Sequence, residues 1–261
     1  MHESAIDRLC MNSPFRDLPP LGKLILSLVL ITSALLATSP PVPLLVLIIG
    51  IVLLVTSSRF YTPRIFVVAY LDTFLIILIG SLIIALLTPG GTIWNGTLGS
   101  ISLAISREGV NLSVLVFLRA LAGFTVLLFF ASSTSIPNLF IALRQVGLPK
   151  NLSELAVLVY RYSFLLVEQV EQMVTAAQCR LGFHDLRSSL RTLSTIIACT
   201  FGRSMDFAER AQYALYCRNF QGNFPLLNPP SKLTIGWLLF PIAIFIFMLI
   251  FAYLTRTWML I

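Results

Sequence analysis

The chain has 261 residues, of which 57% are apolar and only 11% are charged. This composition excludes an ordinary soluble globular domain and indicates a protein of the lipid bilayer. The net charge of +7 is interpreted as a signal of membrane orientation and of contact with anionic lipid, so no nucleic-acid partner is expected. The four cysteines, Cys10, Cys179, Cys199 and Cys217, lack the C-x-x-C spacing of zinc sites, and free thiols are expected.

Charge-poor stretches predict about five membrane-spanning helices, because about 20 apolar residues are needed to cross the hydrocarbon. Spans one and two, at 21–38 and 43–58, are separated by the turn "TSPPVP", since proline cannot continue a helix. Spans three and four are expected at 65–87 and 110–131, and span five at 233–255. The glycine-rich stretch "TPGGTIWNGTLG" between spans three and four is interpreted as a loop rather than a phosphate-binding site.

The distribution of basic residues predicts the orientation in the membrane. The first twenty residues are polar and contain prolines, which argues against a cleavable signal peptide. Ten Lys or Arg residues lie in 132–232, and positive charge concentrates on the cytoplasmic side. We therefore expect a cytoplasmic N-terminus and an external C-terminus. The parts are a cytoplasmic segment (1–20), spans one to four (21–131), a cytoplasmic domain (132–232), and span five with a short tail (233–261).

The cytoplasmic domain is predicted to consist of amphipathic helices. A short helix is expected to begin near Pro137 and to end at Gly147, and a second proline, Pro149, follows it. Two long helices are expected at 152–180 and 188–219, from apolar residues that recur at helical spacing. On the second of them, Arg203, Asp206 and Arg210 are spaced so that opposite charges can pair along one face.

Both long helices end in a loosely repeated sequence, "AAQCRLGF" and "ALYCRNFQG". The alanines permit close approach of another surface, the glycines are expected to end the helices, and an arginine in the last turn is favoured by the helix dipole. The repeat therefore predicts an arginine projecting from each blunt helix end, while ordinary capping by arginine explains the same pattern. The matching positions are Ala176 and Ala214, Cys179 and Cys217, Arg180 and Arg218, Leu181 and Asn219, with Gly182 and Gly222 two positions out of register.

Two charges, Asp72 and Arg119, fall inside spans three and four, where an isolated charge costs roughly 2.5–3.5 kcal/mol. One hypothesis is an ion pair between them; the other is that Asp72 reaches the membrane surface while Arg119 binds backbone carbonyls. The sequence has no G-x-x-x-x-G-K-[ST] motif, so no phosphate-binding loop is expected. With only two histidines, His2 and His184, and no carboxylate cluster in the spans, no metal site is expected either.

Several segments together carry a resemblance to a known family. They are "IDRLCMNSPFRDLPPLGK", "FLRALAGFTVLLFFASST" with "LFIALRQVGLP", "YRYSFLLVEQVEQM", and "GRSMDFAERAQYALYCRNFQG". They resemble the transmembrane (T) component of energy-coupling factor transporters, in the cobalt-type branch called CbiQ, over nearly the whole chain. The resemblance implies an all-α membrane protein with about five transmembrane helices and a cytoplasmic coupling domain of amphipathic helices between spans four and five.

The resemblance also implies a function in which this chain performs no chemistry. In the family, an x-Arg-x motif at the end of each coupling helix enters a groove on an ATPase subunit, and the motif carries over to Arg180 and Arg218. The family commonly has alanine where this chain has Cys179 and Cys217. Two ATP-binding cassette subunits, expected to be identical, would bind ATP and Mg, and this chain would bind no cofactor.

Further expected partners are a membrane substrate-binding (S) component and a small accessory membrane subunit, in a prokaryotic plasma membrane. The substrate implied by the branch is cobalt or nickel, as in cobalamin biosynthesis. Two other classes of function fit less well. A polytopic membrane enzyme acting on lipid at the cytoplasmic face would need a constellation of Asp, His or Lys near the membrane surface, and the sequence has no paired acidic motif of that kind. A self-sufficient secondary transporter usually has repeated halves and interrupted spans that meet at the midplane, whereas the repeat in this chain is in the cytoplasmic segment.

Overall fold

The computed structural model divides the chain into two compact units, which are described separately. The apolar unit comprises residues 3–142 and 230–261, and the α7–α8 unit comprises residues 143–229. The described parts of the chain are residues 13–15, 18–57, 64–88, 92–98, 101–220 and 235–255.

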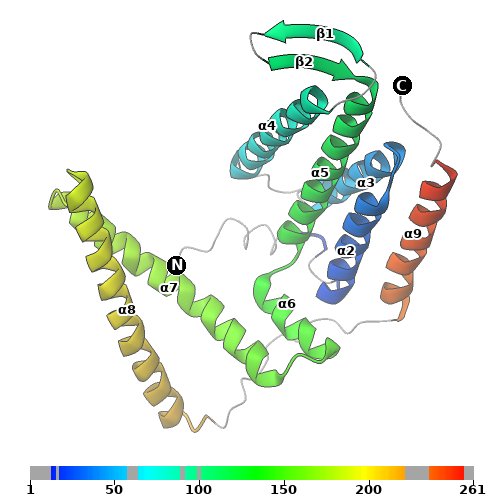
Figure 1. The fold of residues 1–261 in the computed structure, drawn as a ribbon. Helices are drawn as coiled ribbons and strands as arrows, with labels where there is room; N and C mark the ends of the chain where they lie inside the picture. The colour runs from blue at the N-terminus through cyan, green and yellow to red at the C-terminus, as the bar shows by residue number, and fades with distance from the viewer. Residues whose placement is uncertain are drawn as a thin grey trace. The chain divides into compact units, whose positions relative to one another are not determined.

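The apolar unit is a helical bundle centred on α5 (Figure 1). Helices α2, α3 and α4 all pack against α5, and α9 packs against α2. Prolines stand in the first turns of α2 and α3, where their fixed φ suits a helix start and their missing N–H is not needed. The helices are α2 (Pro20–Leu36), α3 (Pro41–Ser57), α4 (Arg64–Leu87), α5 (Arg107–Ser133) and α9 (Ile235–Leu254).

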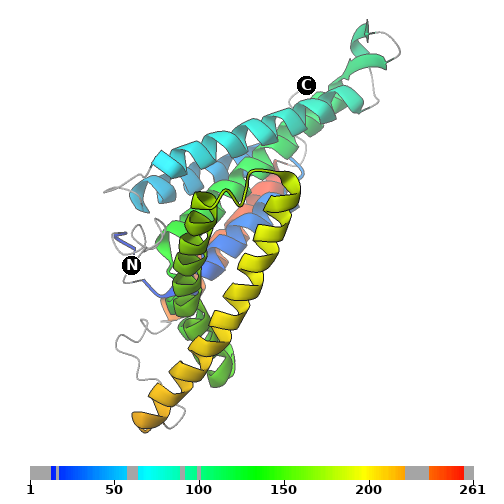
Figure 2. The same cartoon turned by 90° about the vertical axis from the view of Figure 1, so that its left-hand side faces the viewer.

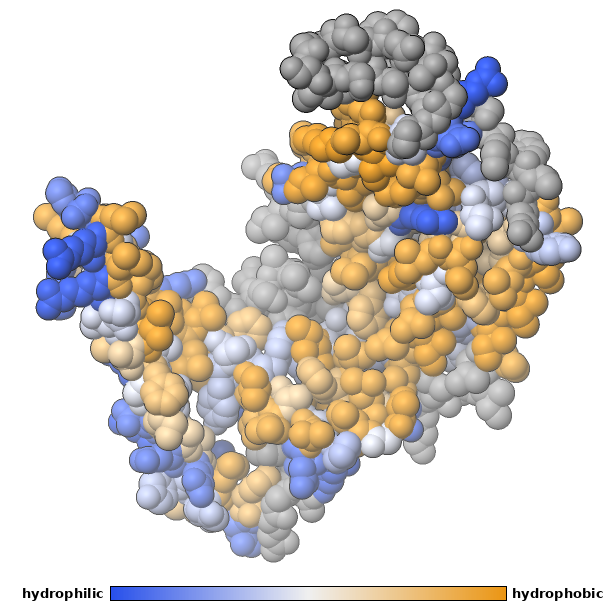
Figure 3. Space-filling model, in the orientation of Figure 1, coloured by the Kyte–Doolittle hydropathy of each residue, from blue (hydrophilic) through white to orange (hydrophobic). Residues whose placement is uncertain are grey.

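The bundle has an apolar core and an apolar outer surface. Leu30, Val42 and Val126 are fully buried between α2, α3 and α5. On the outside, Leu71 and Ile76 of α4 are more than half exposed, and orange side chains gather over the bundle (Figure 3). Water does not favour an exposed apolar surface of this extent, whereas lipid does. The bundle therefore has the surface of a membrane-embedded protein.

The lengths of the helices support this interpretation. Two of the described helical segments, Tyr70–Leu87 and Arg107–Ser133, are long and apolar enough to cross a membrane. Three shorter apolar segments accompany them, Pro20–Leu36, Pro41–Ser57 and Leu239–Leu254. The prediction of an all-α membrane protein is confirmed, while the count of five spans stays a prediction.

The segment between α4 and α5 was predicted as a loop, and this prediction is wrong. Strand β1 (Thr92–Leu98) pairs antiparallel with β2 (Ile101–Ser106), from Thr92 opposite Ser106 to Leu98 opposite Ile101. The signal was present in the sequence, because "TIWNGTL" and "ISLAIS" contain the β-branched and aromatic residues that favour strands. The glycines in the same stretch, which favour a loop, obscure this signal.

Helix α6 (Ile136–Leu143) and a 3₁₀ turn (Arg144–Val146) occupy the predicted short helix, which ends at Gly147 with φ 109°. A left-handed φ of this kind suits glycine because it has no Cβ. Ala142 of α6 is 1% exposed and belongs to the apolar unit. The domain predicted to begin at residue 132 therefore differs from the α7–α8 unit, which begins at residue 143.

Two long helices make up the α7–α8 unit, α7 (Lys150–Cys179) and α8 (Leu186–Cys217). A short turn joins them at one end (Figure 2). Helix α8 begins at the N-cap Asp185, whose Oδ1 accepts a hydrogen bond from the Leu186 N–H at 2.8 Å. Both helices begin and end within two residues of their predicted bounds.

Replacement of Gly109 by alanine is expected to lower the free energy of unfolding by roughly 1–3 kcal/mol, the usual cost of overpacking. An added Cβ would lie 2.9 Å from the Ala85 carbonyl oxygen of α4. The matched control is Gly123→Ala on the same helix, where no atom lies within 4 Å of the new Cβ. Thermal unfolding in detergent measures both variants, and equal stability would contradict this close packing of α4 on α5.

Candidate functional site

The repeated arginines lie at the two ends of one helix. Arg180 follows the last residue of α7 and is joined to α8 by a short turn, and Arg218 follows the last residue of α8. Helix α8 has 32 residues, which corresponds to ~48 Å at 1.5 Å per residue. One arginine thus lies near the start of α8 and the other at its end. We call the ending of α7 at Arg180 the first arginine-tipped end, and the ending of α8 at Arg218 the second.

The two ends have the same backbone conformation. Arg180 has φ −94° and ψ 13°, and Arg218 has φ −94° and ψ 14°. The next residue is left-handed in both cases, with φ 56° for Leu181 and φ 51° for Asn219. No other described non-glycine residue has a positive φ. The sequence repeat is therefore also a repeat of an uncommon structure.

Hydrogen bonding at the two ends is also the same. The Gly182 N–H donates to the Ala177 carbonyl at 2.9 Å, and the Phe220 N–H donates to the Leu215 carbonyl at 3.0 Å. This six-to-one bond, with a shorter bond inside it, is the Schellman ending of a helix. The shorter bonds run from Leu181 N to Gln178 O and from Asn219 N to Tyr216 O, both at 3.0 Å. Backbone groups close both helices, so capping does not need the arginine side chains.

The prediction that glycine ends each helix is wrong. Leu181 and Asn219 take the left-handed position, and Gly222 lies outside the described residues. Gly182 is required for a different reason, because a Cβ there would lie 2.9 Å from Thr192 Oγ1. Its carbonyl accepts hydrogen bonds from Ser188 Oγ at 3.0 Å and Thr192 Oγ1 at 2.9 Å. These bonds fix the first end to the start of α8.

Sequence analysis did not identify Ser188 and Thr192 as part of the site. The available signal was the stretch "DLRSSLRT", in which hydroxyl side chains follow the N-cap Asp185. Such residues often bond to nearby backbone groups at helix starts. Their target, the carbonyl of Gly182, becomes evident only from the conformation of the turn.

The side chains at both ends are open to solvent. Arg180 and Arg218 are exposed, and neither takes part in a salt bridge with a described residue. Leu181 is 72% exposed. The predicted free thiols are confirmed for the three described cysteines, all of them exposed. The exposed small neighbours of the arginines are Ala176 and Cys179 at the first end, and Ala214 and Cys217 at the second.

The pairing predicted along α8 is absent, because no salt bridge joins Arg203, Asp206 or Arg210 in the described structure. An exposed pair of this kind contributes only about 0.2–1 kcal/mol, which solvation of the separate charges offsets. With Gln169 and Phe207, the three side chains line a polar recess of about 250 Å³ between α7 and α8.

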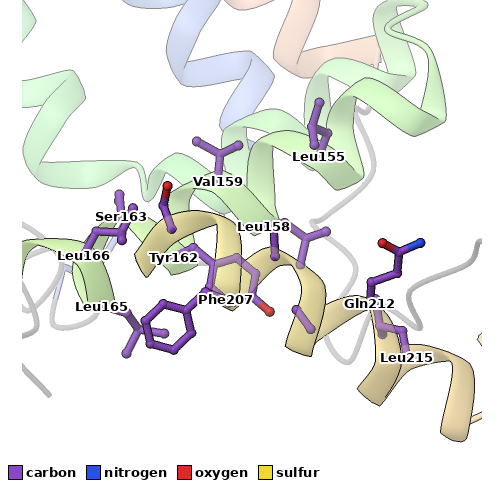
Figure 4. A pocket seen from close by; sticks show the side chains of 13 residues that line it. Leu155, Leu158, Val159, Tyr162, Ser163, Leu165, Leu166, Phe207, Gln212 and Leu215 are labelled. Carbon is purple, nitrogen blue, oxygen red and sulfur yellow. The ribbon is translucent and has the colours of Figure 1, made fainter. Parts of the chain in front are cut away.

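An apolar groove separates the two long helices over part of their length (Figure 4). Its volume is about 440 Å³, and Phe207 lines both the groove and the polar recess. On α7, Leu155 is 56% exposed and Val159 is 60% exposed. The apolar faces of α7 and α8 are therefore only partly covered by each other. The lining comes from 155–166 of α7 and 204–215 of α8.

Asp72 and Arg119 do not form the predicted ion pair. No salt bridge joins these two described residues, and Asp72 is exposed. Arg119 Nη2 instead donates to the carbonyl oxygen of Ala37, directly after the end of α2. Ala37 is fully buried, and the last turn of α2 has no basic residue of its own. Arg119 therefore satisfies a carbonyl that neither water nor α2 reaches.

A family model described as cobalt transport protein, CbiQ, matches residues 11–229 of the chain. The chain belongs to the CbiQ family. The resemblance seen in the sequence is thereby confirmed. A cobalt transport protein CbiQ of Rhodobacter capsulatus is 30% identical over 92% of this chain and 95% of its own length. An uncharacterised protein of Methanocaldococcus jannaschii is also 30% identical, over 98% of this chain and 95% of its own length.

A third relative is described as a fusion protein. It is a putative fused cobalt transport protein CbiMQ of Methanocorpusculum labreanum, 26% identical over 89% of this chain and 39% of the relative. CbiQ membership and the apolar helices make the present chain a membrane component of cobalt transport.

Replacement of Leu181 by glycine is expected to raise the free energy of unfolding by about 0.5–1 kcal/mol. Glycine removes the penalty of a left-handed leucine, although its greater freedom in the unfolded chain offsets part of the gain. Asn219→Gly should give a smaller gain, because asparagine tolerates this conformation. Thermal unfolding in detergent tests the comparison. A lower melting temperature for Leu181→Gly would show that the leucine side chain contributes to packing instead.

Proposed function

We propose that this CbiQ chain is the energy-coupling transmembrane subunit of an ATP-driven importer, and that Arg180 and Arg218 dock its two ATPase subunits. The observation that carries the proposal is the identical construction of the two arginine-tipped helix ends. Two copies of one ATPase offer two identical grooves, and each groove requires the same local shape and charge. A homodimeric ATPase fits this requirement.

Exposure and charge support docking at these ends. Arg180 and Arg218 have no salt bridge within the described chain, so their guanidinium groups are available to a partner carboxylate. A guanidinium binds a carboxylate through two parallel charge-assisted hydrogen bonds. The small side chains beside each arginine leave room for the wall of a groove. ATP and Mg would then be bound by the ATPases.

The transmission of movement is mechanical. Closure of the ATPase pair on ATP would displace both ends of α8, separated by ~48 Å for its 32 residues. A long helix carries such a displacement with little bending. The apolar groove of about 440 Å³ gives α7 and α8 room to change their angle without breaking a tightly packed core. This chain makes and breaks no covalent bond.

The relatives support cobalt as the substrate and a CbiM-type protein as the membrane partner. The fused relative is named for both CbiM and CbiQ, and one polypeptide brings its parts together at fixed stoichiometry. Nickel is the alternative substrate. A small accessory membrane subunit would complete the assembly. We place it in a prokaryotic plasma membrane, with the N-terminus and the α7–α8 unit cytoplasmic and the C-terminus external.

Co-purification with the ATPase tests the docking function. Arg180→Glu and Arg218→Glu should each weaken ATPase capture in detergent, and the double variant should abolish it. Loss of a buried, paired arginine costs roughly 2–5 kcal/mol, more than tenfold in affinity for each site.

Arg203→Glu is the matched control, since Arg203 is an exposed arginine in the middle of α8 and should leave capture unchanged. Each variant must elute as a monodisperse membrane protein. Full capture by the double variant would disprove docking at the two arginine-tipped ends.

A further inference from the structure

A buried lysine lies in the apolar unit, outside the two long helices to which we assign coupling. Lys23 lies in the first turn of α2, is 4% exposed, and its Nζ donates a hydrogen bond of 2.6 Å to the Ser133 carbonyl oxygen. Ser133 is the last residue of α5 and is 1% exposed. The two residues are 110 positions apart in the sequence. Their contact joins the start of α2 to the end of α5.

This bond gives the C-terminal end of α5 a cationic hydrogen-bond donor that the helix itself lacks. The last four carbonyls of a helix have no partner within it, and together they carry a partial negative charge. Helix α5 has no basic residue in its own last turn. Since Ser133 is buried, the cation must come from another element, and Lys23 supplies it. A hydrogen bond from an ionised donor is roughly twice as strong as a neutral one.

Two further contacts hold the same end of α5. The hydroxyls of Ser13, Ser57 and Ser132 form a chain, with oxygen–oxygen distances of 3.1 Å and 3.3 Å. The rings of Phe15 and Phe129 meet edge to face, with centroids 5.7 Å apart. We call Ser13, Phe15 and Lys23 the N-terminal clamp. Lys23 and Phe15 contact the last two turns of α5 directly, and Ser13 reaches them through Ser57 of α3.

The clamped end is also where the chain changes direction. Only Thr134 and Ser135 separate α5 from α6, and Thr134 is 7% exposed. The Thr134 N–H still donates to the Phe130 carbonyl at 3.1 Å, so the last turn of α5 is closed. Helix α6 then leads, through the turn at Gly147, into α7. The bend after Ser133 is therefore a covalent path from the apolar unit to the coupling helices.

We propose that Lys23 is a positioning residue for energy coupling, which holds the bend between α5 and α6 as a fixed pivot. Displacement arriving along α6 then moves α5 as a rigid helix and does not unwind its last turn. This inference rests on the proposed coupling function, but it concerns transmission and not ATPase docking. Ser13 and Phe15 support the same pivot from the N-terminal segment.

The test uses the complete transporter, with its ATPase and membrane partners, in proteoliposomes. Lys23→Met keeps the length of the side chain and removes its charge. We expect about a tenfold fall in Co²⁺ taken up per ATP hydrolysed, within the range of measured couplings between sites. Lys23→Arg should restore most of the ratio. Ser133→Ala is the matched control, because it keeps the backbone oxygen that Lys23 binds.

The ratio separates positioning from mere stability. A stabilising role alone would lower the amount of assembled transporter and reduce uptake and hydrolysis together. An unchanged ratio in assembled Lys23→Met transporter would overturn the proposal. ATPase capture should stay normal in this variant, so loss of capture would bear on the docking function and not on the pivot.

A cysteine pair decides the matter if Lys23→Met fails to assemble. Ser13→Cys with Ser57→Cys places two thiols where the hydroxyl oxygens are 3.1 Å apart. A clamp that stays closed throughout the cycle predicts full uptake after oxidation. Loss of uptake on oxidation, recovered with a reductant and absent from the single-cysteine variants, would show that the clamp must open, and the fixed pivot would be wrong.

Discussion

The apolar unit depends on two reciprocal hydrogen bonds between α2 and α5, in which a basic side chain of each helix binds the carbonyl at the end of the other. Lys23 of α2 binds the carbonyl that ends α5, and Arg119 of α5 binds the carbonyl that follows α2. Both carbonyls belong to buried residues that water does not reach, so each helix end must find a partner within the protein. Fourteen positions separate the cation from the carbonyl on both helices, and the two bonds together fix the antiparallel register of α2 on α5.

The α7–α8 unit has the opposite design. Its helices are closed individually by backbone hydrogen bonds, whereas their shared apolar faces are separated in part by a groove. Stability of each helix and freedom between the helices are thus provided by different interactions. In the apolar unit two hydrogen bonds fix the register of α2 on α5, whereas the groove would let α7 and α8 change their angle in the proposed coupling function. A subunit that transmits movement needs both properties.

Helix positions were predictable because apolar periodicity and prolines mark them directly, as at Pro20, Pro41 and Pro149. The repeated arginines were predictable because each stands in one of two similar short sequences that follow the apolar periodicity of a long helix. The partner of Arg119 was not, because depth along a helix does not reveal which neighbour a side chain faces. The partner of Lys23 was not predictable either, because its acceptor is a backbone oxygen 110 positions away. The left-handed Leu181 was unexpected because glycine ordinarily takes that position.

The hydrogen bonds of Gly182 tie the end of α7 to the start of α8. Ser188 Oγ and Thr192 Oγ1 of α8 donate to its carbonyl oxygen at 3.0 Å and 2.9 Å. The backbone beside Arg180 is therefore held by α8 as well as by its own helix. A load applied at Arg180 would thus be shared between both long helices, and they would respond to it as a pair.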